Sequence, residues 1–239
     1  MTDAFTSVED SSVLLWTGKP NCDAAHSEVL AFLNSHCQPF PTTVGAKDNI
    51  LRGNLGETIV FCLGKSQQFG SNNCLGHFAN ALRPFSGKSN PELDLLWVHF
   101  GNCSKDDWAV LQEVKTTSAD SIAYANNLVS DYDKLFGTNP RLTLQTRFQD
   151  FKNRLEFEQN RPAHILQRAN QLLGVSPVAC PRIRLLPTVV HDSVATDVVD
   201  TMLLVRESLT GKNWADVEPW AIGLSSLDDR LVRLARGKK

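Results

Sequence analysis

Two stretches of the sequence, LDLLWVHF (residues 93–100) and WAVLQEVK (residues 108–115), decide the fold of this chain. Each stretch is mostly apolar and has the length of a typical β-strand. The connecting segment GNCSKDD (residues 101–107) is rich in residues that favour turns, so the sequence predicts a hairpin of two adjacent antiparallel strands. Such a hairpin places Asp94 and Glu113 within reach of one another.

The end of the second strand carries the charged triplet Glu113-Val114-Lys115. Side chains alternate between the two faces of a strand, so Glu113 and Lys115 point to one face and Val114 packs into the other. A Glu-x-Lys triplet on its own is typical of an exposed charged face. Here it ends an almost wholly apolar strand, and buried strands lack charged residues unless those residues have a function. The sequence therefore predicts that Asp94, Glu113 and Lys115 converge on one edge of a sheet.

These residue types suit a magnesium site. Mg²⁺ prefers oxygen ligands in octahedral geometry and keeps several waters, so the carboxylates of Asp94 and Glu113 and the backbone carbonyl of Val114 make a sufficient protein share. Mn²⁺ accepts the same ligands. A metal held there polarises a phosphodiester and activates a bound water. Lys115 is then expected to position that water or to stabilise charge that develops on the phosphate.

The segments Pro91-Glu92-Leu93-Asp94 and Glu113-Val114-Lys115 resemble the active-site motif of the PD-(D/E)xK nucleases, although the proline and the aspartate are not adjacent here. The resemblance implies an α/β fold with a restriction-endonuclease-like core, in which helices flank a central mixed sheet. It also implies metal-dependent DNA hydrolysis with Asp94, Glu113 and Lys115 as catalytic residues. In this superfamily a glutamate on the helix before the first active-site strand often supplies a further metal or water ligand, and Glu57 is the candidate here. The alternative for Glu57 is an ordinary acid on a helix surface.

Within that superfamily the chain is similar to the nuclease subunits of Hachiman-type bacterial antiphage defence. The similarity rests on the length of the chain, on Arg52-Gly53-Asn54-Leu55-Gly56-Glu57, on Asp94-Leu95-Leu96 and on Glu113-Val114-Lys115, and it covers residues 45–120. It implies a DNA endonuclease that a partner, a superfamily 2 helicase, restrains until foreign or damaged DNA is engaged. Two alternatives stay open: a stand-alone restriction or repair endonuclease of the same fold, and a non-catalytic structural subunit.

The composition is that of a globular protein rather than of a polycation that coats nucleic acid. The chain has 239 residues, 42% of them hydrophobic, and a net charge of −2. Residues 1–140 carry 9 Lys and Arg against 15 Asp and Glu, whereas residues 141–239 carry 15 against 11. Eight of these basic residues lie between Arg141 and Arg184, beside three acids. Either this region attracts a phosphate backbone, or its helices simply carry mixed charge.

The sequence predicts neither export nor insertion into a membrane. No segment has the roughly 20 apolar residues that a membrane span needs, and the N-terminus lacks the basic and apolar parts of a signal peptide. We therefore expect a cytoplasmic protein whose six cysteines are reduced. Cys74 and His77 have the spacing of zinc ligands, with Cys62 nearby in the sequence, but no second close pair completes a site. We therefore expect the cysteines to be buried or half-buried residues with a structural role.

The order of the elements predicts a strand and helix extension over residues 1–50, followed by a nuclease-like unit over residues 51–239. The sequence indicates helices over 22–36, 51–63, 120–136, 196–211 and 228–236 and before Gly174, and further strands over 183–190 and 220–224. Pro187 indicates an edge or a bend in the strand over 183–190. Residues 64–92 are expected to be mainly loop. Tyr124 and Tyr132 are expected in the core, with a role at the catalytic edge as the alternative.

Two other motifs are incomplete. Gly64-Lys65-Ser66 and Gly87-Lys88-Ser89 resemble the end of a phosphate-binding loop, but Ile59 and Leu82 stand where that loop needs its first glycine. This argues against an ATPase. His191-Asp192 resembles part of the ligand set of metal-dependent phosphohydrolases, but the remaining histidines of that set are missing.

Overall fold

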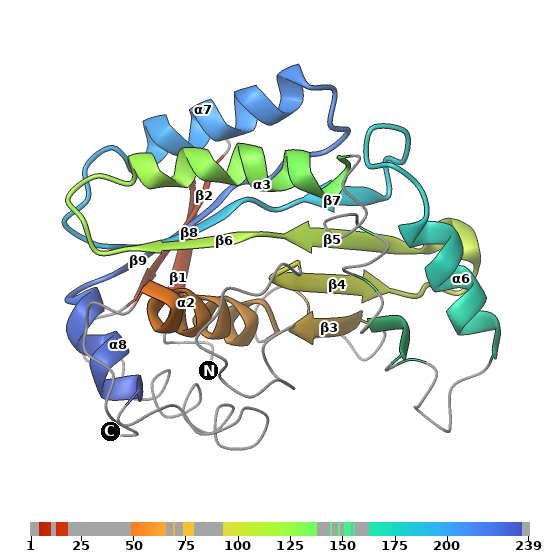
Figure 1. Cartoon of the computed structure of the whole chain (residues 1–239), viewed down its shortest axis with the longest axis horizontal. Coiled ribbons are helices and arrows are strands. Elements are labelled where there is room, and N and C mark those ends of the chain that lie inside the picture. Colours follow the sequence, from red (N-terminus) through yellow and green to blue (C-terminus); the bar gives the residue numbers. More distant parts are fainter. Residues whose placement is uncertain are drawn as a thin grey trace.

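Two mixed β-sheets form the centre of the molecule, and helices lie on both sides of them (Figure 1). The computed structural model describes residues 5–10, 13–18, 49–65, 69, 74–78, 93–137, 144, 148, 151–153, 155 and 163–235. The strands are β1 (Phe5–Asp10), β2 (Val13–Gly18), β3 (Cys74–Phe78), β4 (Leu95–His99), β5 (Trp108–Gln112), β6 (Val114–Thr117), β7 (Ile183–Leu185), β8 (Thr188–Asp192) and β9 (Trp220–Leu224). The α-helices are α2 (Asn49–Leu63), α3 (Asn127–Leu135), α6 (Ala163–Leu173), α7 (Val198–Gly211) and α8 (Leu227–Ala235), and η3 (Ser104–Asp106) and η4 (Ala123–Asn126) are 3₁₀-helices.

The four-stranded sheet has the order β3-β4-β5-β7, and the five-stranded sheet has the order β1-β2-β9-β8-β6. β3, β4 and β5 form an antiparallel meander, and β7 pairs parallel to β5. In the other sheet β1 and β2 form an antiparallel pair, whereas β2, β9, β8 and β6 run parallel. Parallel neighbours need a crossover connection, and α7 supplies it between β8 and β9.

Two long strands pass from one sheet into the other. β5 continues into β6 after Glu113, and β7 continues into β8 after Leu186 and Pro187. Pro187, where the sequence indicated an edge or a bend, lies at the break between β7 and β8 and has no N–H to donate. Two backbone bonds keep the strands together across the interruption, since Leu186 N–H donates to the Leu111 carbonyl and Thr188 N–H donates to the Glu113 carbonyl, each over 2.9 Å. The two breaks therefore lie side by side.

Each face of the sheets has its own apolar core. Alternate residues of β4 belong to opposite cores: Leu96 and Val98 pack in the core of α3 and α7, while Leu95 and Trp97 pack with Leu55 of α2. In Figure 1, α3 and α7 lie above the sheets and α2 and α8 lie below them. The same alternation places Asp94 and Glu113 toward the face of α3 and α7.

Most of the predicted elements are confirmed. β4 and β5 form the predicted hairpin, with Leu95 opposite Gln112 and His99 opposite Trp108. The strand expected over 183–190 lies beside β5 and β6 as β7 and β8. The helices expected over 51–63 and 120–136 are α2 and η4 with α3, and those expected over 196–211 and 228–236 are α7 and α8. The helix before Gly174 is α6, and the strand over 220–224 is β9. The helix expected over 22–36 lies outside the described residues.

The expectation that residues 64–92 are mainly loop is wrong for Cys74–Phe78, which form β3. Gly76 hid this strand, because glycine disfavours strands. A Cβ at Gly76 would lie 2.5 Å from Trp97 Cζ3 and 2.8 Å from Phe61 Cε2. The glycine therefore lets the Trp97 ring, which stacks on Phe61 at a centroid distance of 5.1 Å, lie directly on β3.

The first strands of the chain are part of the five-stranded sheet. β2 pairs parallel to β9 with Leu14 opposite Trp220, so the beginning and the end of the chain meet in one sheet. Trp16 and Trp220 contact each other across these strands, with ring centroids 5.3 Å apart.

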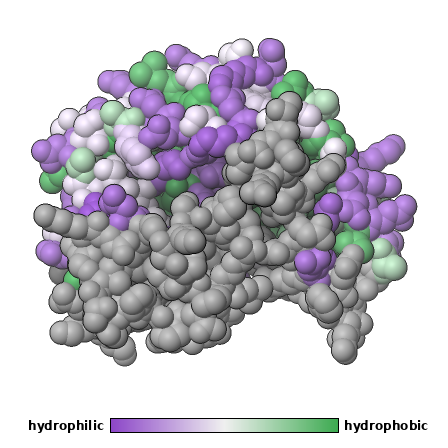
Figure 2. All heavy atoms as spheres, viewed as in Figure 1, coloured by the Kyte–Doolittle hydropathy of each residue, from purple (hydrophilic) through white to green (hydrophobic). Residues whose placement is uncertain are grey.

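Outside the cores, the described surface in Figure 2 is mainly hydrophilic over α3 and α7, with small separate apolar groups. This is what an amphipathic helix such as α3 produces, because its apolar residues Leu128, Tyr132 and Leu135 point into the core. None of the helices in the described ranges has both the length and the apolar character required to cross a bilayer.

Candidate active site

Asp94 and Glu113 lie opposite each other where β5 gives way to β6. The β4–β5 ladder ends at the pair Leu95 and Gln112, and the next residues beyond it, Asp94 and Glu113, are joined by a side-chain hydrogen bond. Residues opposite each other in an antiparallel pair share a face. Asp94 Oδ2 also accepts a hydrogen bond of 2.8 Å from the Val114 N–H, so its side chain replaces a ladder bond just beyond the end of β4. The predicted meeting of Asp94 and Glu113 follows from this register.

Tyr132 of α3 fixes the backbone at Glu113. Its hydroxyl donates to the Leu111 carbonyl over 2.9 Å and accepts the Glu113 N–H over 3.2 Å. The tyrosine is fully buried, and burial together with the charge of Glu113 raises its pKa well above the usual value, so the hydroxyl stays protonated. Tyr132 thus belongs to the core and to the edge of the site, whereas Tyr124 is 55% exposed.

Lys115 points toward α3, where its ammonium forms an ion pair with Asp131. The side chains of Lys115 and Asp131 are 19% and 16% exposed. Burial disfavours the ammonium, but the bond to Asp131 and the charges of Asp94 and Glu113 outweigh it, so the pKa of Lys115 is raised. Burial also opposes the charge of Asp131, yet hydrogen bonds from Lys115 and Lys134 hold its pKa below the usual value. Both partners are charged at neutral pH.

A side-chain hydrogen bond joins the carboxyl groups of Asp94 and Glu113. Burial raises the pKa of Asp94, and the Val114 N–H, the charge of Lys115 and a hydrogen bond with Glu113 offset this effect only in part. Glu113 is itself 4% exposed. Two adjacent buried carboxylates repel each other when both are ionised, so either a proton or a cation is needed between them. This donor chemistry fits a divalent cation that prefers oxygen, with Asp94 and Glu113 as its side-chain ligands and the Val114 carbonyl as the predicted third.

A series of buried hydrogen bonds supports the backbone at the break between β5 and β6 from the face of α2. The Trp97 indole N–H donates to Gln112 Oε1 over 2.8 Å, Gln112 Nε2 donates to Thr188 Oγ1 over 2.9 Å, and Thr188 Oγ1 donates to the Leu186 carbonyl over 3.0 Å. Gln112 is fully buried, and its bonds join β4, β5 and β8 immediately before Glu113. Such a satisfied network restricts the local backbone.

Glu57 lies on α2, the helix on the opposite face from α3, and is 8% exposed. Its neighbour Gly56 packs against β6: a Cβ there would lie 1.9 Å from Thr116 Oγ1. Among the described residues, no three His, Cys, Asp or Glu side chains come together as a metal-ligand set. The part of Glu57 as a fourth active-site residue stays a prediction.

The residues of the other sequence motifs, the cysteines near His77 and the pair His191-Asp192, lie in surroundings that indicate a structural role. Burial raises the pKa of Cys74 to about 11, which keeps its thiol protonated, and Cys62 is buried. Burial lowers the pKa of His191, and its Nδ1 lies 2.8 Å from the Asp192 carbonyl. The Asp192 carboxylate accepts the Leu227 N–H over 2.8 Å at the start of α8. None of these residues belongs to a three-residue metal-ligand set within the described ranges.

Three arginines of the basic segment 141–184 already hold other parts of the chain. Arg168 forms an ion pair with Asp107, and Arg182 donates to the Ser104 carbonyl. Arg184 binds Asp216 at 2.8 Å and Glu218 at 2.7 Å. For these three arginines, ion pairs and hydrogen bonds within the chain account for part of the positive charge, as in the alternative that this region simply carries mixed charge.

The sequence reasoning missed Asp131 and Gln112. Asp131 lies on the exposed-looking stretch between Leu128 and Tyr132, where an acid followed three residues later by Lys134 is typical of a helix surface. Gln112 is a polar residue at the end of an apolar strand, which is a sign of a functional or structural role. The neighbouring Glu113 shows the same feature, so the pattern did not distinguish Gln112.

No family model matches this chain, and no curated protein matches it either.

Proposed function

We propose that the chain is a metal-dependent phosphodiesterase that hydrolyses DNA, with Asp94, Glu113 and Lys115 at its active site. One observation carries the proposal: a side-chain hydrogen bond joins Asp94 and Glu113 at the break between β5 and β6, and the charge of Lys115 acts on the same pair. Paired carboxylates beside a lysine are the groups that metal-assisted phosphodiester hydrolysis requires. The order of α2, β4, β5 with β6, and α3 also agrees with the nuclease superfamily that the motifs resemble, with β3 as an additional strand after α2.

Each of the three side chains has a role in this proposal. Asp94 and Glu113 would hold a magnesium or manganese ion, which supplies charge stabilisation and an activated water when bound. The pKa of Lys115 is raised, so its ammonium is charged at neutral pH next to the pair, where it stabilises negative charge on a phosphate. Asp131 holds that ammonium from the side of α3. Tyr132 and the Val114 N–H fix Glu113 and Asp94, so the geometry exists before substrate arrives.

The direct test is cleavage of supercoiled plasmid by the purified chain with magnesium or manganese, compared with Glu113→Gln and Lys115→Ala variants. We expect cleavage that both variants lose while their circular dichroism spectra stay unchanged. Lys212→Ala is a matched control, because Lys212 also pairs with an aspartate of α3, Asp133, but on the surface. Undiminished cleavage by Glu113→Gln would sink the assignment.

The resemblance extends the proposal to a partner, a superfamily 2 helicase that restrains the nuclease in antiphage defence. The test is copurification after co-expression with a helicase that is encoded nearby. Plasmid cleavage is then measured for the complex and for the chain alone. A restrained nuclease should cleave alone and be silent in the complex until the helicase engages DNA. Cleavage at defined sites without a helicase would instead indicate a stand-alone restriction or repair endonuclease.

One observation favours the non-catalytic alternative: the Lys115 ammonium is bonded to Asp131 rather than to the carboxylate pair. A structural subunit should retain phage protection when Asp94, Glu113 and Lys115 are all replaced by alanine. A catalytic subunit should lose it.

A further inference from the structure

Two adjoining cavities lie at the β4–β5 hairpin, at the end of β5 remote from Glu113. The smaller has a volume of about 190 Å³ and is lined by Ser104, Lys105, Arg168 and Arg182 among others. The larger has a volume of about 360 Å³, which is within the range of small-molecule sites, and includes Trp108 in its wall. Lys105, Asp107 and Arg182 line both cavities, so the two share a boundary.

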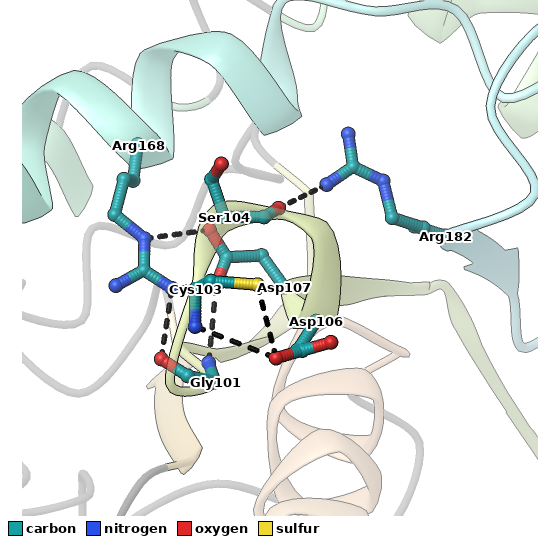
Figure 3. Close-up of polar contacts among 7 residues, drawn as sticks. All are labelled: Gly101, Cys103, Ser104, Asp106, Asp107, Arg168 and Arg182. Atoms are coloured by element: carbon teal, nitrogen blue, oxygen red, sulfur yellow. Dashed lines mark hydrogen bonds and ion pairs between the residues drawn. The ribbon is translucent and has the colours of Figure 1, made fainter.

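The smaller cavity has the chemistry of an anion site. Arg168 of α6 and Arg182, just before β7, approach η3 from opposite sides, with Ser104 between them (Figure 3). Among the described residues of its wall, three side chains are cationic and Asp107 alone is acidic. Asp107 is 2% exposed, and its carboxylate is already bound by Arg168 and by the Gly101 N–H at 3.0 Å. The wall therefore carries an excess of positive charge.

Lys105 and Arg182 supply that excess. Within the described part of the chain neither side chain forms an ion pair with an acid; Arg182 Nη1 donates to the Ser104 carbonyl, which leaves the other guanidinium N–H groups for a ligand. Asp106, their neighbour, has its Oδ2 turned to Cys103, whose N–H lies at 3.4 Å and whose Sγ lies at 3.2 Å. An arginine and a lysine around a serine hydroxyl suit a phosphate group.

The larger cavity suits a planar aromatic group with hydrogen-bond donors. Trp108 lies in its wall and is held by stacking on His99, with ring centroids 5.1 Å apart and an interplanar angle of 7°. Phe69 lies 6.1 Å from the Trp108 ring and lines the same cavity. The carboxylates of Asp106 and Asp216 are also in the wall; Oδ2 of each is bound by Cys103 and Arg184 respectively, and the other oxygen can accept a hydrogen bond from an amino or hydroxyl group.

We propose that the two cavities together form a nucleotide-binding site, with the phosphate in the smaller cavity and the base beside Trp108 in the larger one. The shared boundary at Lys105 and Arg182 sets the phosphate next to the base compartment, as in one nucleotide unit. The nucleotide is either a free mononucleotide or a unit of a single-stranded nucleic acid. This inference does not rest on the proposed hydrolysis, because none of its residues belongs to the Asp94–Glu113 site.

The test is isothermal titration calorimetry of the full chain in EDTA with four probes: adenosine 5′-monophosphate, adenosine, inorganic phosphate and a 5′-phosphorylated hexadeoxynucleotide. EDTA prevents metal-dependent cleavage, so the result is independent of the proposed nuclease activity. We expect adenosine 5′-monophosphate to bind at least tenfold more tightly than adenosine or phosphate. The Lys105→Ala Arg182→Gln double variant should weaken that binding at least tenfold.

Arg230→Gln is the matched control, since Arg230, like Arg182, is a half-buried arginine that donates to a serine carbonyl, that of Ser225, at 2.7 Å. It should bind like the unchanged protein, and the thermal unfolding of each variant shows whether it folds. Tighter binding of the hexanucleotide assigns the site to nucleic acid, and tighter binding of the mononucleotide assigns it to a free ligand; both support the proposal. It is overturned if neither binds at millimolar concentration, if the folded double variant binds equally well, or if phosphate alone binds as tightly as the mononucleotide.

Discussion

The ammonium of Lys115 is paired with the carboxylate of Asp131, and this pair connects β6 to α3 beside the candidate active site. Lys134, one turn along α3, binds the other oxygen of Asp131 at 2.6 Å. Asp131 therefore decides where the Lys115 ammonium lies relative to Asp94 and Glu113. In the sequence the two partners are separated by the whole segment that forms η4 and the start of α3.

Replacement of Asp131 by asparagine should lower both stability and cleavage. A partly buried charge-assisted bond to Lys115 contributes about 1.5–3 kcal/mol, and without it the ammonium is less fixed. We expect a loss of that size in urea unfolding and a lower kcat for plasmid cleavage. Asp133→Asn is the control, because Asp133 pairs with Lys212 on the surface of the same helix. Equal effects of the two substitutions would contradict a special role for Asp131.

The buried carboxylate of Asp94 should make stability fall as the pH rises. Its pKa is raised in the folded state, so the folded chain binds a proton more tightly than the unfolded chain does. Its stabilising effect is complete below the unfolded pKa of about 3.9 and is lost as the pH rises through the folded value. Asp94→Asn, which keeps an acceptor for the Val114 N–H, should therefore raise Tm near pH 8 relative to the unchanged protein and give little gain near pH 4. The measurement is a series of thermal melts, and a Tm difference that does not vary with pH would refute the expectation.

Magnesium should stabilise the folded chain through the same carboxylates. A ligand that binds the folded state alone raises Tm with its concentration. We expect a magnesium-dependent rise in Tm for the unchanged protein that Asp94→Asn and Glu113→Gln each abolish. Asp107→Asn is unsuitable as a control because Asp107 holds Arg168, so Asp200→Asn on α7 serves instead. Retention of the shift in Glu113→Gln would place the cation elsewhere.

Loss of the Tyr132 hydroxyl should destabilise the chain, whereas loss of the Tyr124 hydroxyl should not. In Tyr132→Phe the buried Glu113 N–H loses its acceptor, which costs about 1–3 kcal/mol. Tyr124, the other tyrosine of the chain, is 55% exposed. Urea unfolding of both variants measures the difference. Cleavage should fall in Tyr132→Phe as well, because the hydroxyl fixes the backbone of Glu113.

Two glycines of α2 should respond to alanine in opposite directions. Around Gly53 a Cβ meets no atom within 4 Å, so Gly53→Ala should stabilise the helix by about 0.5–1 kcal/mol. At Gly56 the Cβ would lie 1.9 Å from Thr116 Oγ1, so Gly56→Ala should destabilise by about 1–3 kcal/mol. Thermal or urea unfolding gives both values. The double variant Gly56→Ala Thr116→Ala should recover part of the loss, and no recovery would show that the clash has another origin.

The local sequence was sufficient for the hairpin and for most of the helices. The apolar runs on either side of residues 101–107 specify β4 and β5, and the pairing of Leu95 with Gln112 then brings Asp94 close to Glu113 without information from elsewhere in the chain. The amphipathic spacing of Leu128, Tyr132 and Leu135 likewise specifies the buried side of α3. These features depend on side-chain periodicity, which a sequence displays directly.

Tertiary structure alone decided what surrounds the carboxylate pair. β3 forms although Gly76 weakens it, because the glycine gives Trp97 room to pack. Asp131 binds Lys115, and Gln112 bonds Thr188, which is 76 residues away, only because packing of helices and strands brings these side chains together. Hydrogen bonds and ion pairs between distant segments depend on distances that no local pattern encodes. The sequence thus determined which residues share the face of the candidate site, whereas the packing of α3 and β8 determined how those residues are held.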